Sequence, residues 1–75
     1  MNVTYSIGSE NGNQSIIKKF VDGLGNTQAT KYLAYRDGTF ECFTKNGSKW
    51  DKFSWGKMAA KRFQWAKEGA KAFFS

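Results

Sequence analysis

Two dipeptides that favour tight β-turns, Asp37-Gly38 and Asn46-Gly47, constrain this chain more than any other feature. Residues typical of β-strands flank both of them. Asp-Gly and Asn-Gly accept the positive φ angles of a type I′ turn, which joins two antiparallel strands directly. The sequence therefore predicts a three-stranded antiparallel meander, with strands at residues 30–36, 39–45 and 48–53.

Counting outward from the two turns predicts the register of this meander. Paired residues point to the same face, and successive residues alternate between faces. The predicted pairs are Arg36–Thr39, Tyr35–Phe40, Leu33–Cys42 and Tyr32–Phe43, then Lys45–Ser48, Phe43–Trp50, Glu41–Lys52 and Phe40–Phe53. The predicted core face holds Leu33, Tyr35, Phe40, Cys42 and Phe53, with Trp55 at its edge. The other face carries a row of rings, Tyr32, Phe43 and Trp50, surrounded by Arg36, Lys45 and Lys52.

The N-terminal part is predicted to form a strand and a short helix. Residues 3–7 alternate between apolar and polar, as in a strand, and a polar loop follows. Apolar residues then recur at helical spacing between Ser15, a candidate N-cap, and Gly23 or Gly25. The alternative is a second strand, paired with residues 3–7 through a turn at Asn11-Gly12, which the β-branched pair Ile16-Ile17 would tolerate.

A long helix is predicted from about Ser54 to Phe74. Its apolar stripe has alanines in the middle, where a helix can approach a sheet closely. The stripe consists of Trp55, Ala59, Phe63, Ala66, Ala70 and Phe73. The predicted fold is therefore α+β, a single domain of residues 1–75 in the order β-α-β-β-β-α, with the meander packed on the C-terminal helix.

Composition argues against an enzyme. The 75 residues include one cysteine and no histidine, so the common zinc sites and histidine-based catalytic sites cannot form. No nucleophile has an identifiable base, and the glycines follow no phosphate-loop or dinucleotide spacing. Cys42 is predicted to be a buried thiol. We expect no catalytic residues, no metal and no cofactor.

Charge points to an anionic partner. Twelve basic against six acidic residues give a net charge of +6, and 17% of the residues are aromatic, more than a small core needs. The chain shows no secretory signal and no apolar run long enough to span a bilayer, which predicts a cytoplasmic protein without a membrane partner.

The predicted ring row is the first candidate site. Rings can stack on bases while cations neutralise phosphates, or charged side chains can enter the major groove. Basic residues in the first half of the last helix add possible phosphate contacts near its N-terminal amides. The candidate nucleic-acid-binding residues are Tyr32, Arg36, Phe43, Lys45, Trp50, Lys52, Lys57, Lys61 and Arg62. The alternative is that the first helix covers the row, which then forms a second small core.

Two families resemble parts of the chain. Phe53, Ala59-Ala60, Phe63 and Ala66 follow the meander, and this resembles the Apetala/ethylene-response (phage-integrase-type) DNA-binding domain over about residues 30–68. That resemblance implies that the outer sheet face enters the major groove, with contacts from Arg36, Lys45, Trp50 and Lys52.

The predicted order of helix, three strands and helix, with Lys57 and Ala60-Lys61 opening the last helix, also resembles double-stranded RNA-binding domains. In that family basic residues at this helix start clamp phosphates. The loop between the first two meander strands is only Asp37-Gly38, without the groove-reading loop of that family. DNA is therefore expected before RNA.

A protein partner is the alternative from another class. Tyr, Trp and Arg dominate the hot spots of protein interfaces, so the ring row could equally anchor a partner. By analogy with compact proteins of phages and mobile elements, the chain could inhibit a host protein or a defence complex. Salt dependence separates the two hypotheses, because nucleic-acid binding weakens steeply with salt.

Overall fold

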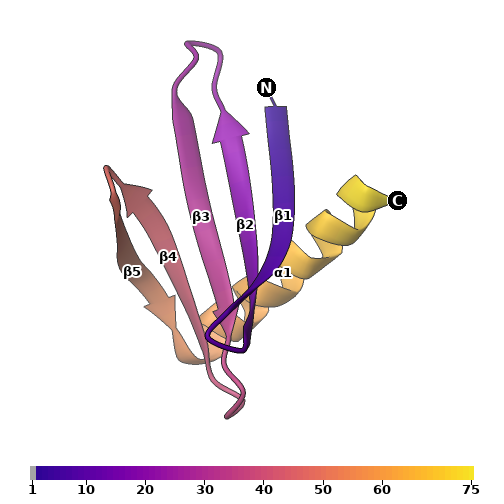
Figure 1. Cartoon of the computed structure of the whole chain (residues 1–75). Helices are drawn as coiled ribbons and strands as arrows, with labels where there is room; N and C mark the ends of the chain where they lie inside the picture. The colour runs from indigo at the N-terminus through magenta and orange to yellow at the C-terminus, as the bar shows by residue number, and fades with distance from the viewer. Residues whose placement is uncertain (1) are drawn as a thin grey trace.

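A five-stranded antiparallel sheet and one C-terminal helix make up the fold in the computed structural model, which describes residues 2–75 (Figure 1). The strands follow the chain order across the sheet, so every connection is a hairpin. The elements are β1 (Asn2–Glu10), β2 (Asn13–Val21), β3 (Thr27–Ala34), β4 (Phe40–Asn46), β5 (Lys49–Trp55) and α1 (Gly56–Phe74). The α+β class, the meander and the C-terminal helix are confirmed.

The predicted first helix is wrong, because residues 13–21 form β2. Asn11 and Gly12 have φ angles of 53° and 81°, the conformation of a type I′ turn, and they place β2 antiparallel to β1. Pairing with β1 therefore determines that residues 13–21 form a strand, although the spacing of their apolar residues also fits a helix. The second strand through Asn11-Gly12, which was the alternative, is the one observed.

The predicted register of β3 and β4 is wrong by one residue. Tyr35 N–H donates to the Thr39 carbonyl at 2.8 Å, and Gly38 N–H donates to the Tyr35 carbonyl at 3.0 Å. Gly38, at φ 92°, is thus the left-handed residue of a longer loop rather than half of a two-residue turn. The observed pairs are Ala34–Phe40, Leu33–Glu41, Tyr32–Cys42, Lys31–Phe43 and Thr30–Thr44.

One residue of slip exchanges the two faces of β3. Leu33 and Tyr35, which were predicted in the core, lie on the face away from the helix, whereas Tyr32 lies on the helix side. The predicted row of Tyr32, Phe43 and Trp50 is therefore broken, since only Phe43 and Trp50 remain together.

The predicted register of β4 and β5 is wrong by two residues, which leaves the faces unchanged. Asn46 pairs with Lys49 around Gly47-Ser48, so Lys45 pairs with Trp50 and Phe43 with Lys52. A bulge follows, because Cys42 pairs with Ser54. Phe53 occupies this bulge, beneath the guanidinium of Arg62 at 5.5 Å, and is not a core residue.

Helix α1 covers one face of the sheet, called here the covered face (Figure 1). Ala59, Phe63, Ala66 and Ala70 are buried, as the predicted stripe requires. Phe63 meets Phe40 with ring centroids 5.4 Å apart, and Ile16 is fully buried in the same cluster. The stripe is wrong at both ends.

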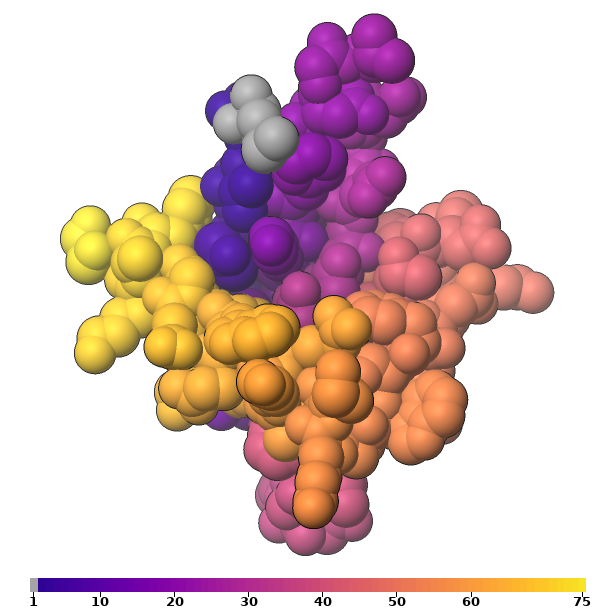
Figure 2. Space-filling view, turned by 180° about the vertical axis from the view of Figure 1, so that it is seen from behind, coloured from indigo at the N-terminus to yellow at the C-terminus, as the bar shows by residue number. Residues whose placement is uncertain are grey.

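At the start of the helix, Trp55 belongs to β5 and is 63% exposed. Near its other end, Phe73 is 45% exposed, although its ring centroid lies 5.9 Å from that of Tyr5. Figure 2 shows this side of the molecule, where the upper parts of β1, β2 and β3 extend beyond the helix.

The opposite face, called here the open face, has no helix over it within residues 2–75. Its β1–β2 end nevertheless curls over it, since the lower end of β1 crosses in front of the sheet in Figure 1. Arg36 N–H donates to the Asn13 side-chain carbonyl, which ties this turn to the β3–β4 loop. Leu33 and Ala29 are buried on this face although no helix of the described chain covers it.

Candidate nucleic-acid interface

The open face gathers aromatic rings and lysines on β3, β4 and β5. The register places Phe43 and Lys45 of β4 beside Lys52 and Trp50 of β5, and Lys31 of β3 beside Phe43. Trp55, paired with Glu41, lies on the same face. This group, called here the ring–lysine surface, consists of Lys31, Phe43, Lys45, Trp50, Lys52 and Trp55.

Lys31 lies at the centre of this surface. Its ammonium is 5.1 Å from the centroid of Phe43 and 5.0 Å from that of Trp50, and it forms an ion pair with Glu10 at 2.9 Å. Only 8% of the residue is exposed. A lysine held this way fixes the two rings and keeps a positive charge directly beneath the surface.

The rim of the surface carries further cations over rings. Lys45 lies 5.5 Å from the centroid of Trp50, and Lys52 lies 5.8 Å from that of Trp55. Because cations sit over the rings, apolar and positive groups alternate across the surface, the combination that binds bases and phosphates together.

A hollow adjoins this surface where the sheet opens. The last β3–β4 pair is Thr30–Thr44, and beyond it the two strands separate, as Figure 1 shows. A depression of about 400 Å³ lies here, with Lys19 and Lys45 in its lining. The lining residues are Lys19, Thr27, Ala29, Lys45 and Gly47. Neither lysine forms an ion pair within residues 2–75.

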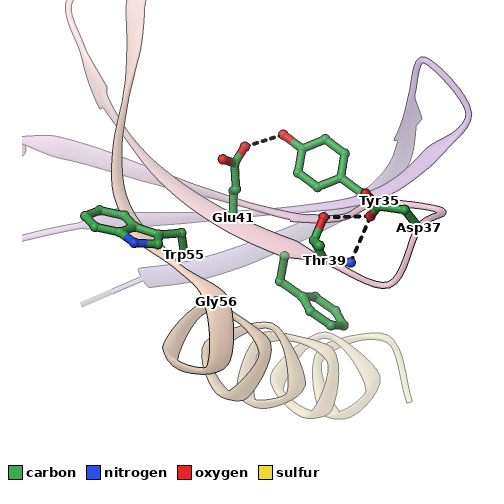
Figure 3. A pocket seen from close by; sticks show the side chains of 7 residues that line it. Tyr35, Asp37, Thr39, Glu41, Trp55 and Gly56 are labelled. Atoms are coloured by element: carbon green, nitrogen blue, oxygen red, sulfur yellow. Dashed lines mark hydrogen bonds between the residues drawn. The ribbon is translucent and has the colours of Figure 1, made fainter.

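The opposite end of the open face is a pocket of about 470 Å³ between the β3–β4 loop and the start of α1 (Figure 3). Glu41 lies between Tyr35 and Trp55 there, accepting a hydrogen bond from the Tyr35 hydroxyl and pairing with Lys52 at 3.1 Å. The Tyr35 bond and Lys52 hold the pKa of Glu41 below its usual value, and the same bond raises the pKa of Tyr35 to about 12. Glu41 therefore stays ionised and neutralises Lys52.

The predicted site residues divide among four places. The structure brings together Phe43, Lys45, Trp50 and Lys52 on the open face. Arg36 lies in the β3–β4 loop, at the other end of β4 from Lys45. Exposed Lys57 and Lys61 lie on α1, Lys61 over the Trp65 ring. Tyr32 and Arg62 lie on the covered face, between sheet and helix, where burial raises the pKa of Tyr32.

Three residues of the ring–lysine surface and the adjoining hollow were not predicted for this site: Lys19, Lys31 and Trp55. Trp55 was assigned to the helix stripe. The alternation along β2 and β3 marks Lys19 and Lys31, but only for a reader who already knows that residues 13–21 form a strand and how β3 pairs.

The remaining chemistry is limited. Cys42 is buried, as predicted, and burial raises its pKa to about 11. No group of three or more potential metal ligands occurs within residues 2–75. Over the same residues, no helix combines the length and the apolar character needed to cross a bilayer.

Comparisons with family models, with curated proteins and with solved structures gave no match.

Proposed function

We propose that this protein binds nucleic acid through the open face of its sheet. The observation that carries the proposal is the ring–lysine surface, which no helix of the described chain covers. Stacking of a base on an aromatic side chain contributes about 1–3 kcal/mol, and lysines beside the rings meet the phosphates.

Electrostatics supports a polyanionic ligand. The two carboxylates of this face, Glu10 and Glu41, are each paired with a lysine. Lys19 and Lys45 are therefore uncompensated beside the hollow, and the whole chain adds its net charge of +6. Such a field raises the local concentration of an anionic partner.

DNA is the first ligand to test. The resemblance to a sheet-type DNA-binding domain rested on Phe53, Ala59-Ala60, Phe63 and Ala66 after a three-stranded meander. The order β3, β4, β5 and α1 is compatible with it. The resemblance to RNA-binding domains rested on a first helix, and β2 lies in its place. We therefore test DNA before RNA.

The test is fluorescence anisotropy with labelled duplex DNA, single-stranded DNA and RNA, all carrying a 5′ hydroxyl, at several salt concentrations. We expect saturable binding to DNA, with a log–log salt slope that Lys45→Gln and Lys19→Gln each reduce by about one. Lys67→Gln, on the exposed side of α1, is the matched control and should leave the slope unchanged. An equal reduction of the salt slope in all three variants would show that the ligand is attracted to net charge alone. It would refute the proposal that the open face is the binding site.

A protein partner remains the second candidate because of one observation, the exposure of Trp55 beside the pocket at Tyr35 and Glu41. An exposed tryptophan at the edge of a pocket is a usual anchor of protein interfaces. Absence of saturable binding to every nucleic acid would favour this candidate. Trp55→Ala should then abolish binding of the protein partner, because a few hot-spot residues carry most of the binding energy of such an interface.

A further inference from the structure

A second positively charged pocket lies on the covered face, between β1–β3 and the middle of α1. Its volume is about 200 Å³. Strand register brings Tyr5, Lys18 and Tyr32 to the same side of three neighbouring strands, opposite one turn of the helix. The lining residues are Tyr5, Lys18, Tyr32, Arg62, Trp65 and Ala66, and this group is called here the Lys18–Arg62 pocket.

Two positive charges line this pocket and no carboxylate does. Neither Lys18 nor Arg62 forms an ion pair within residues 2–75, where the pairs are Lys31–Glu10 and Lys52–Glu41. Two cations brought close together without a counter-charge repel each other, so an anion between them would be strongly favoured.

Arg62 carries a buried polar atom without a partner. Its Nε is buried and forms no hydrogen bond to any described residue. The guanidinium is held in place by the ring of Phe53, 5.5 Å away. Unpaired buried donors are rare in native proteins, and a bound ion is one of the explanations for them. The planar guanidinium fits an oxyanion with two parallel hydrogen bonds.

The other lining groups suit the same ligand. The hydroxyls of Tyr5 and Tyr32 are potential hydrogen-bond donors at the sheet side of the pocket. Trp65, at the helix side, is 58% exposed and offers a ring face next to the cations. A pocket this small accepts a phosphate-sized group, with anything attached to it lying outward against Trp65.

We propose that the Lys18–Arg62 pocket binds the phosphate of a phosphomonoester. Lys18 and Arg62 neutralise its two negative charges, the guanidinium of Arg62 donates hydrogen bonds to its oxygens, and Trp65 packs against the organic part. The proposal does not depend on binding at the open face, because the two sites lie on opposite faces of the sheet. Free mononucleotide and the 5′-terminal phosphate of a nucleic-acid strand present the same chemistry.

Two adjacent lysines give a matched pair for the test. Lys18 points to the covered face and lines the pocket, whereas Lys19 points to the open face and lines the hollow there. Each variant, Lys18→Gln or Lys19→Gln, removes one charge from the same strand, so net charge changes equally. Only the face differs.

The experiment is an NMR titration of the ¹⁵N-labelled protein with inorganic phosphate and with adenosine monophosphate, following the Arg62 Nε–H and Trp65 indole signals. We expect saturable shifts of both, with affinity about tenfold weaker in Lys18→Gln and unchanged in Lys19→Gln, as loss of one charge-assisted bond predicts. Arg62→Lys keeps the charge but loses the planar guanidinium that donates two parallel hydrogen bonds, so it should also weaken binding. Unsaturable shifts, or equal losses in both lysine variants, would overturn the proposal, and Lys18→Gln suffices if Arg62→Lys does not fold.

Short single strands with a 5′ phosphate or a 5′ hydroxyl identify the source. Tighter binding of the phosphorylated strand, lost in Lys18→Gln, would support the pocket and assign it to strand ends. Binding of the mononucleotide without any preference for the phosphorylated strand would support the pocket and assign it to free nucleotides. The proposal for the open face fails by a different result: strands with a 5′ hydroxyl then do not bind, while the titration with phosphate still shows saturable binding.

Discussion

The covered and open faces of this sheet are both ordered, but they are ordered by different means. The covered face buries small and apolar groups, such as Ile16, Cys42 and Phe63, beneath a helix whose alanines allow close approach. The open face buries Leu33 without a helix over it, and its rings are fixed by the paired ammonium of Lys31. Packing beneath a helix stabilises the first face, whereas charge orders the second and leaves it without a helix over it.

The largest effect should come from removing one ring on each face. Phe63→Ala deletes a buried ring from the core cluster and should lower the free energy of unfolding by about 3–5 kcal/mol, because it leaves a cavity. Phe43→Ala removes a half-buried ring from the open face and should cost less than about 2 kcal/mol. Urea denaturation followed by circular dichroism measures both.

The binding assay completes this pair. Phe43→Ala should weaken nucleic-acid binding while the protein remains folded. A loss of stability as large as that of Phe63→Ala would instead show that the open face is a second core, and the comparison of the two faces would fail.

The sequence predicts the class of this fold better than its faces. Alternation, turn dipeptides and the alanine stripe identify β3, β4, β5 and α1, because each is a local pattern. Which face a β3 residue occupies depends on whether Asp37-Gly38 forms a two-residue turn or contributes Gly38 to a longer loop with a left-handed glycine. The same dipeptide permits both, and the choice moves Leu33 and Tyr32 to opposite sides.

The candidate site was therefore predicted in part. Phe43, Lys45, Trp50 and Lys52 were placed together correctly because they belong to one hairpin, where an error of two residues preserves the faces. Lys19 and Lys31 depend on β2, which the helical spacing of Ile16, Ile17 and Phe20 concealed. Pairing to β1 and β3 outweighs that spacing, and pairing is not a local property of the sequence.

The burial of Cys42 on the covered face should make the free energy of unfolding depend on pH in alkali. Burial raises the pKa of this thiol from 9.0 to about 11, so the folded protein keeps a proton that the unfolded chain has lost. This contribution is fully present below about pH 9 and disappears as the pH rises towards 11, a loss of about 2–3 kcal/mol. Urea denaturation between pH 8 and pH 11 measures it.

Cys42→Ala is the control for this titration. Every other ionisable group is common to both proteins, so the difference between the two pH profiles isolates the thiol. We expect the variant to be less stable at pH 8 and to lose less stability towards pH 11. Parallel profiles, or rapid alkylation of the native thiol at pH 8, would mean that the covered face is open to solvent.

The smallest change in the free energy of unfolding should come from Glu41 on the open face, at acidic pH. The hydrogen bond from Tyr35, followed by the Lys52 ammonium, lowers the pKa of Glu41, so the unfolded chain takes up a proton on this carboxyl before the folded protein does. Its contribution is present above the usual glutamate pKa and is lost as the pH falls through the lowered value.

Because the group is partly exposed, removing it in Glu41→Gln should cost less than about 1 kcal/mol at pH 7. The variant should also show a shallower loss of stability in acid denaturation, and Tyr35→Phe should reproduce much of that change. An unchanged acid slope in both variants would show that the pocket end of the open face is held by packing, as the covered face is, and not by charge.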